Sequence, residues 1–156
     1  MRKVYIVLAA VLLILAVGGL VYWLERPTTG LEPIVWDRSS CSHCHMHIGD
    51  PNFASQLQTT DGEVHNFDDT GCLFEWREEH QPSVREVFFH HYQREQWLTG
   101  DQVGFVRIDE DTPMGYGLGA VSRAEQPEAM GLEEAARTVL EMRRPHEQEP
   151  EPTTRH

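Results

Sequence analysis

Seven consecutive residues of this chain, at positions 41–47, contain six side chains that can bind a soft metal ion. The segment reads Cys-Ser-His-Cys-His-Met-His and holds two of the three cysteines of the chain. Structural cysteines are usually dispersed through a core as small apolar residues, whereas closely spaced thiols and imidazoles are typical of metal or cofactor sites. An extended segment would direct Cys44 and Met46 to one side and the histidines to the other. A turn at Ser42 and His43 would instead bring Cys41 beside Cys44. In either geometry, the segment predicts a metal or cofactor site.

An apolar run near the N-terminus predicts a membrane anchor. Arg2 and Lys3 precede a run from Val4 to Leu24 that carries no charge, and about 20 such residues cross a bilayer as a helix. The alternative is a cleaved signal peptide, but the run is longer than a typical signal-peptide core and no good cleavage site stands out. The basic N-terminus is expected to stay in the cytoplasm. Residues 1–25 are therefore predicted to be an uncleaved single-pass anchor in the cytoplasmic membrane, with the rest of the chain in the periplasm.

The remaining sequence divides into a linker, one domain and a tail. Residues 26–37 contain Pro, Thr and Gly residues that resist regular structure, and they are expected to form a linker. Residues 38–143 are expected to fold as a small domain, and residues 144–156, rich in Glu and Pro, are expected to be a disordered tail. The formal net charge of −12 argues against binding to nucleic acid or anionic lipid surfaces, because both need a concentrated basic surface.

The first half of the domain is predicted to have the element order ββαβ. Two strands, at 53–58 and 63–67, are joined through Asp61-Gly62, a dipeptide that favours a tight hairpin. The next residues, Asp68 or Asp69, are expected to cap a helix that ends before a proline at position 82. Residues 84–92 are rich in strand-forming side chains.

The second half begins with a predicted strand at 102–108, followed by a glycine-rich segment at 112–119. A short strand and then an amphipathic helix within 127–143 complete it. We expect an α+β fold for a small domain with these elements.

Five short motifs follow one another along the chain: Cys41-x-x-Cys44-x-Met46, Phe53-Ala-Ser-Gln, Phe67-Asp-Asp-x-Gly-Cys72, Trp97 and Thr112-Pro-Met-Gly115. This succession resembles the NosL family, from about Val35 to about Val139. Members of that family are membrane-attached copper chaperones for the assembly of nitrous oxide reductase, an enzyme of denitrification. The resemblance implies a fold of two small ββαβ-like units that binds Cu(I) for delivery to a copper enzyme outside the cytoplasm. It also implies nitrous oxide reductase or its assembly factors as partners. We therefore expect a copper carrier and not an enzyme.

Three features depart from the family pattern. Family members commonly carry glycine where this chain has His45. Many members are lipoproteins, whereas this chain has an apolar N-terminal run. The strand expected after the last helix is only weakly supported by the sequence, which indicates a truncated second unit.

Cu(I) is the ion that this donor set favours. Thiolate and thioether ligands suit Cu(I), whereas zinc prefers several thiolates or imidazoles in a closed tetrahedron. The predicted ligands are Cys41, Cys44 and Met46, and Met114, which lies in the last motif of the resemblance, is expected to complete the set. For Cys72, the interpretation as a buried structural thiol is favoured over that of a ligand. The possible additional ligands are His45, His43, His47 and Cys72.

Two other functions remain open for the pair of Cys41 and Cys44. Together with His45, the segment satisfies the Cys-x-x-Cys-His pattern of covalent haem c attachment, and Met114 would then be the second axial ligand. Against haem, a small c-type cytochrome is largely helical, whereas much of this chain reads as strands. The two thiols could also form a redox pair, although no thioredoxin-like pattern surrounds them. Outside the cytoplasm thiols tend to oxidise, so these cysteines must be protected by a ligand, used in exchange, or bonded covalently.

Overall fold

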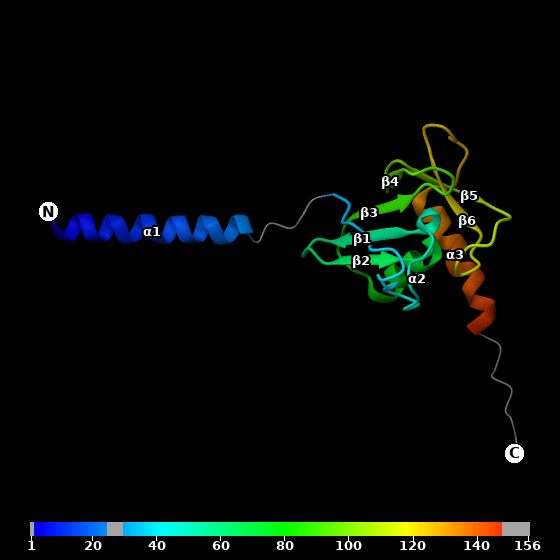
Figure 1. The fold of residues 1–156 in the computed structure, drawn as a ribbon, viewed down its shortest axis with the longest axis horizontal. Coiled ribbons are helices and arrows are strands. Elements are labelled where there is room, and N and C mark those ends of the chain that lie inside the picture. The colour runs from blue at the N-terminus through cyan, green and yellow to red at the C-terminus, as the bar shows by residue number, and fades with distance from the viewer. Residues whose placement is uncertain (1, 25–29, 148–156) are drawn as a thin grey trace, which may run out of the picture. The chain divides into compact units, whose positions relative to one another are not determined.

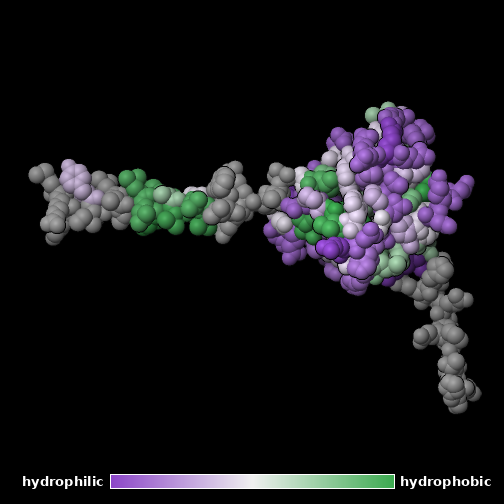
Figure 2. Space-filling model, viewed as in Figure 1, coloured by the Kyte–Doolittle hydropathy of each residue, from purple (hydrophilic) through white to green (hydrophobic). Residues whose placement is uncertain are grey.

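The computed structural model describes residues 2–24 and 30–147, and the chain divides between Gly30 and Leu31 into two compact units. The first unit contains a single helix, α1 (Arg2–Leu24), which covers the apolar run predicted from the sequence (Figure 1). Its described side chains from Val11 to Val21 are exposed to solvent. The coloured part of α1 is mainly hydrophobic in Figure 2, whereas the visible face of the second unit is mainly hydrophilic. 

Within the described residues, no helix meets both the length and the hydropathy that a membrane span requires. The predicted membrane span is therefore not confirmed.

The second unit is built on a four-stranded antiparallel sheet in the order β2-β1-β3-β4. Helix α2 follows the β1–β2 hairpin and precedes β3, so the predicted ββαβ order of the first half is confirmed (Figure 1). A single turn of 3-10 helix, η1, leads into β1. The bounds are η1 Pro51–Phe53, β1 Ser55–Thr59, β2 Val64–Phe67, α2 Thr70–His80, β3 Val84–His90 and β4 Trp97–Thr99.

The second half of this unit differs from a second ββαβ unit. Strands β5 (Val103–Arg107) and β6 (Leu118–Ser122) form a separate two-stranded sheet, and α3 (Leu132–Glu147) follows. No strand follows α3 within the described residues, as the weak sequence pattern there indicated. Strand β4 was not predicted, because it has only three residues, and it pairs with β3 of the first sheet.

Two predicted domain boundaries differ from the structure. Helix α3 continues to Glu147, past residue 143 and through Pro145. The rest of the predicted tail, residues 148–156, lies outside the described residues. The predicted linker also ends earlier than expected. The backbone N–H of Glu32 donates to Gln56 Oε1 and its carbonyl accepts from Gln56 Nε2, both at 2.9 Å, so the chain joins the domain well before residue 37.

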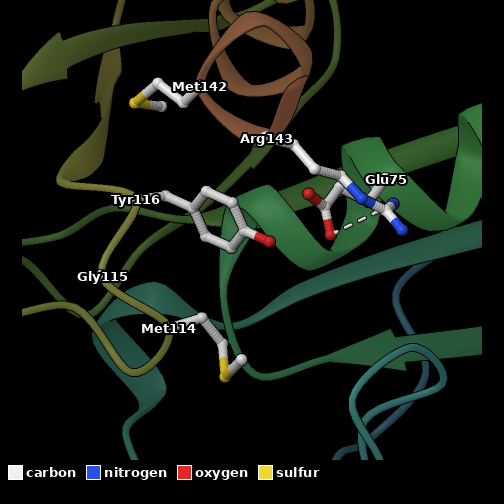
Figure 3. Close-up of a pocket in the computed structure, with 6 residues that line it drawn as sticks. All are labelled: Glu75, Met114, Gly115, Tyr116, Met142 and Arg143. Carbon is white, nitrogen blue, oxygen red and sulfur yellow. Dashed lines mark ion pairs between the residues drawn. The ribbon is translucent and has the colours of Figure 1, made fainter. Parts of the chain in front are cut away.

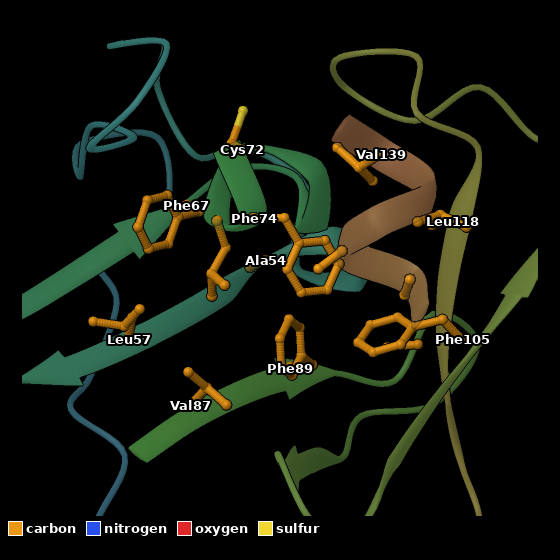
Figure 4. Packing of buried hydrophobic residues seen from close by; sticks show 14 of the residues in the cluster. Ala54, Leu57, Phe67, Cys72, Phe74, Val87, Phe89, Phe105, Leu118 and Val139 are labelled. Atoms are coloured by element: carbon orange, nitrogen blue, oxygen red, sulfur yellow. The ribbon is translucent and has the colours of Figure 1, made fainter. Parts of the chain in front are cut away.

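An aromatic cluster joins the two halves into one core. Phe74 of α2, Phe89 of β3 and Phe105 of β5 lie with ring centroids 5.0–6.0 Å apart, and two of the three contacts are edge-to-face. Such arrangements are favoured by the quadrupoles of the rings. Figure 4 shows this cluster beneath α2 and α3. The sulfur of Cys72, at the start of α2, points away from the rings in the same view. Helix α2 therefore carries both core residues and a thiol that faces elsewhere.

Candidate metal centre

The segment 40–47 forms a narrow loop that folds back on itself. Ser40 pairs with His47 in an antiparallel bridge, and the backbone N–H of Cys41 donates to the carbonyl of Met46 at 2.8 Å. The reversal requires a left-handed backbone at His45, where φ is 62°. Glycine is the residue that adopts this conformation without cost, so a glycine at position 45 would suit this turn better than histidine does. The turn that was one of the two predicted geometries is thus present.

Contacts with β2 and α2 fix this loop on the domain. The N–H of Ser42 donates to the carbonyl of Asn66 in β2 at 2.8 Å. The N–H of Gly49 donates to Asp68 Oδ1 at 3.3 Å, just before α2 begins. The loop therefore lies over the point where β2 ends and α2 starts.

The start of α2 is defined by Asp69. Its side chain accepts from the N–H of Gly71 at 2.9 Å and so caps the helix, as predicted for this aspartate pair. Cys72 is the third residue of the helix, in the first turn. Helix N-termini favour negative charge, including that of a thiolate. The capping residue thus places a thiol where the Cys41–Cys44 loop lies.

Three thiols meet at this point. The sulfur atoms of Cys41, Cys44 and Cys72 all lie within 4.8 Å of one another. Cys41 is 1% exposed and Cys72 is fully buried, whereas Cys44 is half-buried. Cys41 and Cys44 were predicted to form the site, and the structure brings them together. Cys72, for which a structural thiol was the favoured interpretation, stands beside them with a donor atom directed into the same cluster.

The three thiols differ in their affinity for protons. The pKa of Cys41 is lowered to about 5, chiefly because the thiol of Cys72 donates a hydrogen bond to its sulfur. Backbone N–H groups of Asp68, Cys44 and His43 add to this effect, and burial opposes it. The pKa of Cys72 is raised by that same hydrogen bond and by burial, and the pKa of Cys44 is raised mainly by burial. The cluster therefore favours the deprotonated form of Cys41 and the protonated forms of Cys44 and Cys72.

The predicted thioether ligands lie at the surface. Met46 is 54% exposed, and its backbone N–H is directed at the sulfur of Cys44. Met114 is 39% exposed, and its backbone N–H donates to Asp69 Oδ2 at 3.0 Å. Asp69 therefore holds the loop of Met114 against the same helix turn that carries Cys72. Ligation by Met46 and Met114 stays a prediction.

The three histidines of the segment have different surroundings. His45 and His47 are exposed. The ring of His43 lies against α2, with Nε2 2.8 Å from Glu75 Oε2 and Nδ1 3.6 Å from Glu79 Oε2. Both ring nitrogens of His43 thus face carboxylates in this arrangement. Ligation by any of the three was proposed from the sequence only as an addition, and it stays a prediction.

The sequence analysis did not predict a role for Glu75 near the site. It also did not predict the hydrogen bond between the backbone of Met114 and the side chain of Asp69. Glu75 follows Cys72 by three residues, a spacing that places two side chains on the same side of a helix. That spacing alone could have drawn attention to Glu75. Nothing local in the sequence pairs it with His43, which is 32 residues away.

The chemistry of the cluster fits a soft cation. Three sulfur donors at close range, of which Cys41 favours the thiolate form, suit Cu(I), which accepts low coordination numbers. A structural zinc site closes with four donors, whereas among the described residues no further His, Cys, Asp or Glu joins these three cysteines.

Comparisons with known proteins bear on the family and on the fold. The model of the NosL family matches residues 34–139. Among solved structures, the copper chaperone NosL from Shewanella denitrificans is similar, with a TM-score of 0.51 and 21% sequence identity. The match covers 74% of this chain and 89% of that one, and at this identity it shows a shared fold. No curated protein matches the chain.

Proposed function

This chain belongs to the NosL family, and from that premise we propose that it binds Cu(I) and passes the ion to a copper-requiring protein outside the cytoplasm. The observation that carries the proposal is the convergence of three sulfur atoms within 4.8 Å. Nitrous oxide reductase, or one of its assembly factors, is the recipient that the family resemblance implies. Membership of the family agrees with the prediction of a carrier that is not an enzyme.

The different burial of the three thiols supports different roles for them in binding and in transfer of the ion. Cys41 and Cys72 are buried and would hold the ion from the inside of the domain. Cys44 is half-buried and is the thiol that an incoming ligand would reach first. Met46 and Met114 are proposed as thioether ligands that approach the ion from the exposed side. Exchange of one ligand at a time at Cys44 would move Cu(I) to a recipient without releasing it to water.

Covalent haem is less compatible with the surroundings of Cys41. Its sulfur accepts hydrogen bonds from the thiol of Cys72 and from backbone N–H groups, and the residue is 1% exposed. A porphyrin bonded to that sulfur would have to displace these contacts. A visible spectrum of protein made together with a cytochrome c maturation system separates the two cases, because only haem would give a Soret band that survives denaturation.

The proposal includes attachment to the membrane through α1, with the second unit in the periplasm. It rests on the uncharged run from Val4 to Leu24 and on the exposure of the described apolar side chains between Val11 and Val21. An apolar helix without a polar face is otherwise found buried in a protein or a bilayer.

A competition titration tests copper binding. The reduced protein competes for Cu(I) with a chromophoric chelator, and we expect one equivalent to be bound. Cys41→Ser/Cys44→Ser should lose tight binding, and Cys72→Ser should weaken it strongly. The variants of the two proposed thioether ligands, Met46→Leu and Met114→Leu, should lose less affinity than the cysteine variants, because both side chains are partly exposed. Tight stoichiometric binding by the double cysteine variant would contradict the proposal.

A further inference from the structure

A buried carboxylate lies one helical turn beyond Cys72. The side chain of Glu75 is 6% exposed, and its Oε2 atom is 2.8 Å from Nε2 of His43 and 3.6 Å from Nη1 of Arg143. The hydroxyl of Tyr116 also donates a hydrogen bond to this carboxylate. Figure 3 shows Glu75 on α2 between Tyr116 and Arg143. Three separate segments thus converge on one carboxylate: the cysteine loop, the loop that carries Met114 and Tyr116, and α3.

The contact with His43 leads directly to the metal centre. His43 lies between Cys41 and Cys44 in the chain, and its backbone N–H donates to the sulfur of Cys41. Its ring is held by Glu75 at the other end. The carboxylate therefore fixes the residue whose N–H donates to the sulfur of Cys41.

The contact with Tyr116 fixes the second loop. The ring of Tyr116 lies so close to Gly71 that a Cβ atom there would be 2.2 Å from it, so only glycine fits under the ring. Two residues earlier in the chain, the backbone N–H of Met114 donates a hydrogen bond to the side chain of Asp69. A cavity of about 430 Å³ adjoins Glu75 and Tyr116, so the loop is not packed on that side. The polar contacts of Tyr116 and Met114 therefore add to the packing of the Tyr116 ring in placing this loop.

We propose that Glu75 is a positioning residue of the metal centre, which sets the cysteine loop and the Met114 loop at fixed places around Cys72. A buried carboxylate is costly unless it is paired and hydrogen-bonded, and removal of a partner is then strongly felt. Outer-shell groups of this kind orient the ligands of metal sites. Here the orientation is transmitted through the ring and the backbone of His43. This inference rests on the proposed function for its copper readout.

The test compares Glu75→Gln with Glu79→Gln, its matched control. Glu79 also faces His43 and Arg143, but its side chain is 39% exposed, and exposed ion pairs contribute little. Loss of an outer-shell partner typically lowers metal affinity about 10- to 100-fold, and we expect a Cu(I) affinity loss in that range for Glu75→Gln. Glu79→Gln should bind as the wild type does.

A second readout does not involve copper. In the metal-free reduced protein, peptide mapping after limited reaction with a thiol reagent reports the reactivity of each cysteine. Glu75→Gln should change the rate at Cys41, whereas Glu79→Gln should not. The wild type could fail to bind Cu(I) while Glu75→Gln and Glu79→Gln still differ in the reaction rate at Cys41. That result would contradict the proposed function and would support the positioning role of Glu75.

His43→Gln approaches the same contact from the loop. It should reproduce the affinity loss of Glu75→Gln, and the double variant should lose little more, because both changes break one contact. This variant also decides the question if Glu75→Gln does not fold. Wild-type affinity and wild-type Cys41 reactivity in a folded Glu75→Gln or His43→Gln variant would overturn the inference.

Discussion

At the scale of single residues, the sulfur of Cys41 has the most distinctive environment in the site. Its pKa of about 5 in the folded chain compares with about 8.5 for a thiol in an unfolded chain. Between these values the unfolded state binds more protons than the native state, so stability rises with pH. The contribution is complete above the unfolded pKa and is lost as pH falls toward 5.

This linkage predicts the pH dependence of folding in the reduced, metal-free protein. The free energy of unfolding should increase between pH 7 and 8, by up to about 1.4 kcal/mol per pH unit for one proton. Around pH 8.5 and above, Cys44 and Cys72 act in the opposite direction, because their pKa values are raised in the folded chain. Denaturant titrations at several pH values measure the increase. His90 and His91, whose pKa values are lowered by burial, affect stability mainly below this range. Cys41→Ser should abolish the increase and Cys44→Ser should keep it. An increase that is the same in Cys41→Ser would show that Cys41 is not the source.

The part of the site that lies within a few residues could be predicted from the sequence. Cys41 and Cys44 are three positions apart, and this spacing alone indicates that they bind the same metal ion or cofactor. Cys72 could not be assigned to the site from the sequence. It lies 28 residues or more after Cys44 and Cys41, and no spacing rule links it to them; only the fold brings it beside them. Asp69 was recognised as a cap, but its bond to Met114 depends on how two distant loops meet.

At the scale of elements, the N-terminus of α2 holds the site together through Asp69. Asp69→Ala removes the cap of α2 and leaves the N–H of Met114 without its acceptor. Loss of a cap and of a partly buried hydrogen bond together should lower the free energy of unfolding by about 1–3 kcal/mol. Asp50→Ala is the matched control, because Asp50 caps only the three-residue η1, and its loss should be smaller. Equal losses in denaturant titrations would contradict this role of Asp69.

Elements with strong local signals were predicted well, and those defined by distant contacts were not. The hairpin at Asp61-Gly62 and the helix after Asp69 were expected, and both are present. Strand β1 is buried along its whole length although it contains Ser, Gln and Thr. The buried side chain of Gln56 forms hydrogen bonds with the backbone of Glu32. The pattern of polar and apolar residues along the strand does not reveal this partner. Strand β4 exists because β3 offers it an edge.

At the scale of the whole molecule, the proposed anchor predicts where the chain resides. The full chain should remain with membranes after an alkaline wash and should retain its N-terminal residues by mass spectrometry. A chain that begins at Leu31, where the second unit starts, should be released as soluble protein that still binds Cu(I). Recovery of the full chain in the soluble fraction, or of a chain cleaved after the apolar run, would contradict the anchor without affecting the copper site.

The central claim is that Cys41, Cys44 and Cys72 together hold Cu(I), and X-ray absorption at the copper edge tests it most directly. The copper-loaded wild type should show the edge of Cu(I) and a nearest shell of sulfur, and Cys72→Ser should have fewer sulfur neighbours. A wild-type shell made only of nitrogen and oxygen, or a spectrum unchanged by Cys72→Ser, would contradict the three-thiol centre.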